Sequence, residues 1–66
     1  MKPLRTELHL RTAALEKRPI VVFCGAELIG SGVIEKITDH AVMIRNKAKP
    51  EQTEYYLRNN CVFYAL

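Results

Sequence analysis

The chain has 66 residues, 48% of them hydrophobic, with a net charge of +3 and two cysteines. A chain of this length forms one domain, residues 1–66, and buries only about 60% of its unfolded surface, so its core is small. Two cysteines are too few for a disulfide scaffold, and no His/Cys cluster has zinc spacing. Self-association is the remaining common way to stabilise such a domain.

The first segment, residues 1–18, is expected to be a basic N-terminal helix. Its apolar residues Leu4, Leu8 and Leu15 fall on one narrow stripe if residues 4–17 are helical. A narrow stripe predicts a helix that packs on top of a sheet rather than inside a core. Pro19 ends this helix, because proline cannot continue the helical hydrogen-bond ladder.

All of the excess charge lies on this first segment. Residues 1–18 hold five basic and two acidic side chains, whereas the rest of the chain holds five of each. Such a segment is either a surface for phosphate groups or a solvated helix face. In the first case its candidate RNA contacts are Arg5, Arg11, Lys17 and Arg18.

Residues 19–66 are expected to form five short antiparallel strands. Runs rich in β-branched and aromatic residues, bounded by turn residues, predict strands at Ile20–Cys24, Glu27–Ile37, Ala41–Arg45, Thr53–Arg58 and Cys61–Leu66. The second run is long and contains Gly30-Ser31-Gly32, where we expect a sharp bend. Thr38-Asp39-His40 is expected to be a turn in which Asp39 caps the backbone, and Asn59-Asn60 another turn. The pattern therefore predicts a small barrel or sandwich.

The last predicted strand, Cys61–Leu66, is apolar on both faces. Strands buried on both sides have this pattern, and we expect no part of the same chain to cover the second face. An unpaired apolar edge invites association with another chain. The sequence therefore predicts a homo-oligomer, with Tyr56, Val62 and Tyr64 as candidate subunit-interface residues.

Four segments resemble the Sm-like family of small β-barrels, and Hfq in particular. They are the strand entry Arg18–Phe23, the Gly-x-x-Leu-x-Gly pattern of Gly25–Gly30, the strand end Ile34–Asp39, and the Leu57-Arg58-Asn59-Asn60-Cys61-Val62 run, which is similar to the second Sm motif. Together they span roughly residues 10–66. The resemblance implies a mainly β fold, with one N-terminal helix and a five-stranded, strongly bent antiparallel Sm-like (SH3-like) barrel.

The same resemblance implies a function. Sm-like proteins assemble into rings, and Arg58, Asn59 and Asn60 match the turn that lines the pore and contacts single-stranded RNA. His40, in the other turn at this rim, could stack on a base or donate a hydrogen bond to phosphate. The leading hypothesis is therefore a cytoplasmic, ring-forming RNA-binding protein, a possible post-transcriptional regulator, with a suspected preference for uridine-rich RNA.

Two positions favour a different partner. Ala41 and Met43 stand where the family pattern has a planar side chain and an asparagine, both of which contact the base. The alternative hypothesis is therefore a protein–protein interaction module on the same fold, for example an inhibitor or accessory subunit, and a third is a purely architectural ring. No pattern predicts an enzyme or a cofactor, and the N-terminal charges are unlike a secretory signal, so we expect reduced thiols in the cytoplasm.

Overall fold

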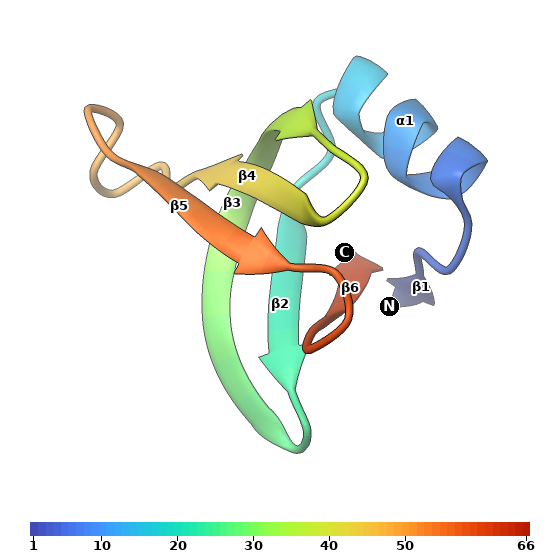
Figure 1. Cartoon of the computed structure of the whole chain (residues 1–66). Helices are drawn as coiled ribbons and strands as arrows, with labels where there is room; N and C mark the ends of the chain where they lie inside the picture. The colour runs from blue at the N-terminus through green and yellow to red at the C-terminus, as the bar shows by residue number, and fades with distance from the viewer.

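The structure, a computed structural model, describes all 66 residues and is mainly β, with one helix and one six-stranded antiparallel sheet (Figure 1). The strands follow one another in the sheet in the order β1-β6-β2-β3-β4-β5. The last strand along the chain therefore returns to lie beside β2. In chain order the elements are β1 (Lys2–Pro3), α1 (Glu7–Leu15), β2 (Ile20–Cys24), β3 (Glu27–Ile37), β4 (Ala41–Arg45), β5 (Thr53–Leu57) and β6 (Val62–Ala65).

The N-terminal segment differs from the prediction. Its first residues form the short strand β1, which pairs with β6, so the sheet has six strands rather than five. The helix begins only at Glu7, because Thr6 is its N-cap and the Thr6 hydroxyl accepts a hydrogen bond from the His9 N–H at 3.1 Å. Strand β1 pairs along the edge of β6, so the expectation that the last strand leaves an unpaired edge was wrong.

The buried face of α1 is also not the leucine stripe. Leu10 and Ala13 are buried in the core, whereas the Leu8 and Leu15 side chains are 71% and 84% exposed. Leu4 is buried, but it precedes the helix and its N–H donates to the Phe63 carbonyl at 2.8 Å. The small Ala13 side chain lets the helix lie close to the sheet, which a face of leucines would not allow.

The bend in β3 lies at Gly32, within the predicted Gly30–Gly32 segment. Residues up to Gly32 pair with β2, and residues from Val33 onward pair with β4. A Cβ on Gly32 would overlap the carbonyl oxygen of Arg45, and the φ angle of 150° disfavours any other residue. Gly32 therefore lets one strand belong to two halves of the sheet, as the curved β3 in Figure 1 shows.

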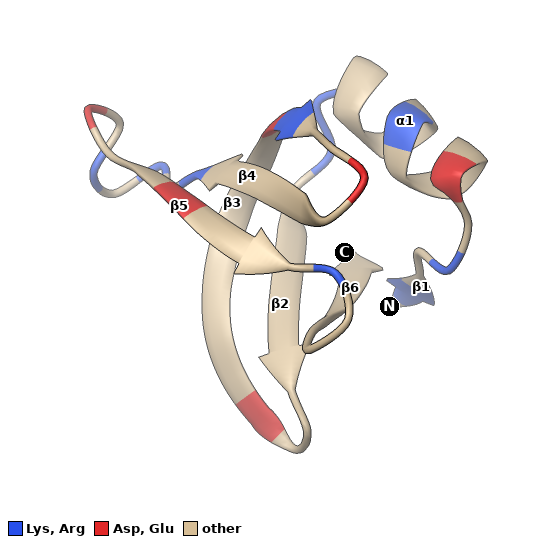
Figure 2. Cartoon of the chain, viewed as in Figure 1, with Lys and Arg blue, Asp and Glu red and all other residues tan.

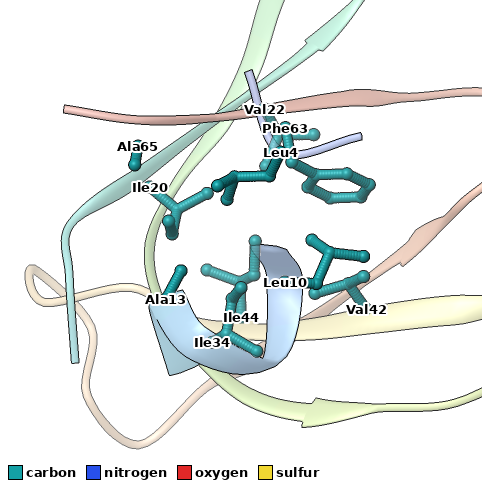
Figure 3. Packing of buried hydrophobic residues seen from close by; sticks show 10 residues of the cluster. All are labelled: Leu4, Leu10, Ala13, Ile20, Val22, Ile34, Val42, Ile44, Phe63 and Ala65. Carbon is teal, nitrogen blue, oxygen red and sulfur yellow. The ribbon is translucent and has the colours of Figure 1, made fainter. Parts of the chain in front are cut away.

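The sheet is not closed by hydrogen bonds, since β1 and β5 are its two edges. Instead, the Tyr56 ring of β5 crosses to β3, where a Cβ on Gly30 would overlap the Tyr56 hydroxyl. The space between the two halves is filled by apolar side chains, which Figure 3 shows pointing toward one another. The buried cluster consists of Leu4, Leu10, Ala13, Ile20, Val22, Ile34, Val42, Ile44, Phe63 and Ala65.

The close approach at Gly32 makes a testable prediction. Gly32→Ala should lower the free energy of unfolding by about 3 kcal/mol, because the new methyl group would collide with the backbone of β4. Gly25→Ala is the matched control: Gly25 has a φ of 62° but open space around it, so that variant should lose only about 1 kcal/mol. Urea unfolding followed by circular dichroism measures both, and equal losses would contradict the assigned role of Gly32.

Candidate functional site

Arg58 lies in the turn between β5 and β6 and holds three segments together. Its Nη1 donates to the Thr38 carbonyl at 2.7 Å, in the turn between β3 and β4, and its Nη2 donates to Oε1 of Glu7, on α1, at 2.8 Å. The backbone N–H of Arg58 donates to the His40 carbonyl at 2.8 Å. The side chain is 23% exposed, so the guanidinium has a fixed position and one side open to solvent.

Glu7 is the acidic partner at the centre of this arrangement. It also accepts a hydrogen bond from Nε of Arg11 at 3.0 Å, and it occupies the first turn of α1, where the helix dipole favours a negative charge. The hydrogen bond from Arg58 is the main cause that holds the pKa of Glu7 below its ordinary value of 4.5. Sequence reasoning missed Glu7, although its spacing of four from Arg11 and its place in the first helical turn were visible.

A cleft beside this arrangement brings together predicted site residues from both ends of the chain. It has a volume of about 510 Å³, and Arg5, Arg58 and Asn59 form its polar part. Figure 2 shows basic residues on the segment between β1 and α1 and at the end of β5, on the two sides of β6 in this view. The other lining residues are Leu4, Leu10, Cys61, Val62, Phe63 and Tyr64. We call this site the basic cleft.

The remaining turn residues lie close to the basic cleft. Asn60 is exposed in the same turn as Arg58, and His40 is exposed in the adjacent turn that Arg58 contacts. The Thr38 hydroxyl, rather than the Asp39 carboxylate, makes the side-chain hydrogen bonds of that second turn, since it accepts from the N–H groups of His40 and Ala41. The two predicted turns thus stand side by side.

The basic residues of the N-terminal segment do not form one surface. Arg5 precedes α1 and Arg11 lies in its middle, whereas Lys17 and Arg18 follow its last turn. Arg18 donates from Nη2 to the Leu66 carbonyl at 3.1 Å and lies 3.9 Å from Oε1 of Glu16. Lys17 is exposed and has a φ of 55°. The structure therefore unites Arg5 with Arg58 and leaves Lys17 and Arg18 apart from them.

The predicted interface residues fall into two groups. Val62 and Tyr64 lie on the outer face of β6, where the Tyr64 ring meets Phe23 edge-to-face at 5.6 Å between centroids. Leu28 pairs with Phe23 across the sheet and is 57% exposed. We call these four residues the outer patch. Tyr56, in contrast, packs against the core of its own chain, which leaves Tyr55 as the outward tyrosine of β5.

The basic cleft holds several hydrogen-bond donors. Its polar groups are two guanidinium groups, an amide and a phenol, which suit phosphate and base contacts. No group of three or more His, Cys, Asp or Glu side chains is placed so that it could hold a metal ion. The helix α1 is too short and too polar to span a membrane. No family model matches the chain, and no curated protein or solved structure is similar enough to it to count as a match.

The Glu7 contacts predict a pH-dependent stability. A carboxyl whose pKa is lowered by folding stabilises the protein above its unfolded pKa, and this contribution is lost as the pH falls through the folded pKa. Glu7→Gln should therefore be less stable than the wild type at neutral pH, and the difference should shrink below the ordinary value of 4.5. Urea unfolding at neutral pH and at about pH 3 measures this.

Glu16→Gln is the control, because Glu16 is also an exposed glutamate, at the other end of α1, but its one ion pair, with Arg18, is long at 3.9 Å. Its stability should stay close to that of the wild type at both pH values. If Glu7→Gln lowers the free energy of unfolding equally at both pH values, the carboxylate charge is not what stabilises the fold.

Proposed function

We propose that this chain is an Sm-like domain that binds short single-stranded RNA in the basic cleft without catalysing a reaction. The observation that carries the proposal is the convergence of Arg5 and Arg58, from opposite ends of the chain, on one cleft that also holds Asn59 and Tyr64. A cleft of about 510 Å³ has the size of sites that take small organic ligands. A nucleotide with its phosphate and base matches this set of groups.

Each polar group of the cleft has a role in this proposal. Arg5 is exposed and takes part in none of the chain's ion pairs, so its guanidinium is free to meet a phosphate. Arg58 is held by Glu7 and Thr38, and its remaining N–H donors extend the positive charge along the cleft. The Tyr64 ring offers a surface for base stacking, and the Asn59 amide can bond to a base edge.

The Sm-like class is part of the proposal, and the order of elements supports it. A helix precedes five strands, β2–β6, and the second of these strands is long and bent at a glycine. The short strand β1 is an addition to that order. We include a cytoplasmic location in the proposal, because the RNA that such a domain would bind is found there.

Arg5→Ala tests the RNA-binding proposal, because Arg5 supports no other part of the structure. Its removal should weaken binding of a labelled uridine-rich oligonucleotide by about tenfold. The plot of log affinity against log salt should also become less steep, by about one. Fluorescence anisotropy at several salt concentrations measures both quantities. Lys47→Ala, in the exposed loop between β4 and β5, is the charge-matched control and should bind as the wild type does.

Two outcomes would overturn the proposal. One is that the wild type binds no oligonucleotide at low salt. The other is that Arg5→Ala and Lys47→Ala weaken binding equally, since a loss that follows net charge alone would not need the basic cleft.

A second function, a protein contact, is favoured by the outer patch. Phe23, Leu28, Val62 and Tyr64 place apolar groups on a sheet face that no other element covers, and Ile29 beside them is 40% exposed. Exposed apolar patches of this kind mark interaction sites. We propose self-association through this patch, because a small domain gains the stability it lacks when a second copy buries such a surface.

Leu28→Lys tests self-association, because Leu28 lies in the outer patch but not in the basic cleft. The wild type should elute from size-exclusion chromatography with light scattering as a species of more than one chain, and Leu28→Lys should elute as a monomer. Leu15→Lys, at a leucine on α1 that is even more exposed than Leu28, should remain associated. A wild type that stays monomeric at high micromolar concentration would contradict this proposal.

A further inference from the structure

The pairing of β2 with β6 brings the two cysteines near each other, with Cys24 at the end of β2 and Cys61 just before β6. In the pairing of β2 with β6, Val22 faces Phe63 and Phe23 faces Val62. Continuing this register by one residue places Cys24, the last residue of β2, opposite Cys61, which directly precedes β6. Figure 1 shows the turn that enters β6 beside the end of β2. This proximity could not be predicted from the sequence, because the two residues lie far apart in the chain.

The hydrogen bonds of the neighbouring residues show whether Cys24 and Cys61 occupy a hydrogen-bonded or a non-hydrogen-bonded position of the antiparallel pair. The Phe63 carbonyl accepts from the Leu4 N–H, so the backbone groups of Phe63 point toward β1. The backbone N–H and C=O groups of successive residues point alternately to the two sides of a strand. Cys61 therefore shares the orientation of Phe63, and its backbone makes no hydrogen bond to Cys24. Opposed residues at such non-hydrogen-bonded positions have Cα atoms about 4.5 Å apart. That separation lies within the range of disulfides, about 4.4–6.8 Å.

Both thiols also point to the same face of the sheet. Side chains alternate along each strand, so Cys24 shares the inner face with Ile20 and Val22, and Cys61 shares it with Phe63 and Ala65. Cys24 is exposed, whereas Cys61 is half-buried and packs against the core. Burial raises the pKa of the Cys61 thiol, and the nearby Cys24 raises it further, in agreement with the register.

We propose that Cys24 and Cys61 form a reversible disulfide across the β2–β6 pair when the protein meets a low-molecular-weight disulfide. The exposed Cys24 thiolate attacks one sulfur of that oxidant, whose S–S bond breaks and releases one thiolate. The Cys61 thiolate then attacks Sγ of Cys24, which forms the protein disulfide and releases the second thiolate. The protein loses two electrons, the oxidant becomes two thiols, and these take the two cysteine protons.

The disulfide would hold β2 and β6 together covalently in a sheet that hydrogen bonds do not close. It would join the end of β2 to the start of β6, and the part of the chain between them contains β3, β4 and β5. Closing so long a loop restricts the unfolded chain strongly, which favours the folded state. The oxidised form should therefore unfold at a clearly higher temperature than the reduced form.

The experiment uses the full chain, equilibrated with mixtures of reduced and oxidised glutathione and quenched with an alkylating reagent. Intact-mass spectrometry should show a single chain that has lost two hydrogen atoms and carries no alkyl group, and dithiothreitol should restore both reactive thiols. The midpoint of thermal unfolding should rise by about 10 °C or more on oxidation. Cys24→Ser and Cys61→Ser, as matched controls, should instead retain glutathione on the remaining cysteine.

Three results would overturn the proposal. They are a wild type that carries glutathione on both cysteines, a wild type whose disulfides link separate chains, and a wild type that stays fully reduced in the most oxidising mixture. Because none of these readouts involves RNA, the outcome is independent of the proposed binding function.

Discussion

The fold depends on one close backbone approach, between Gly32 of β3 and the Arg45 carbonyl of β4. A single sheet encloses a core when it folds over itself, and that requires one strand to leave its first neighbour and continue along another. Gly32 is where β3 does so. The buried cluster lies between the two halves that this bend creates, and α1 covers the remaining opening with Leu10 and Ala13.

The same bend explains the position of the basic cleft. Folding the sheet brings the turn after β3 and the turn after β5 together, so that Arg58 can bond to the Thr38 carbonyl. The carboxylate of Glu7 then ties α1 to this pair of turns, and the segment that leads into the helix carries Arg5 to the rim of the cleft. Arg58 is thus a structural residue first, because its guanidinium joins both turns to the helix.

The sequence predicted the local features well and the long-range ones poorly. Strands β2, β3 and β4 begin and end where their apolar runs and turn residues indicated, and the bend falls at the glycines. The prediction that a stripe of leucines forms the buried face of the helix was wrong. The spacing of apolar residues alone does not show that Thr6 caps the helix after Leu4. Strand β1 was missed because two residues carry no pattern, and only their pairing with β6 identifies them.

In the candidate site too, the residue types could be predicted from the sequence, whereas their arrangement in space could not. Arg58, Asn59 and Arg5 were recognisable as residue types, but that they share one cleft follows from the return of β6 beside β2. This return also brings Cys24, at the end of β2, near Cys61, just before β6, and places Phe23 against Tyr64 on the other face. One strand pair therefore carries a thiol pair on its inner face and an apolar patch on its outer face, while the basic cleft lies at its end. Because Cys61 and Val62 also line that cleft, a disulfide or an association at this strand pair would alter the lining of the cleft.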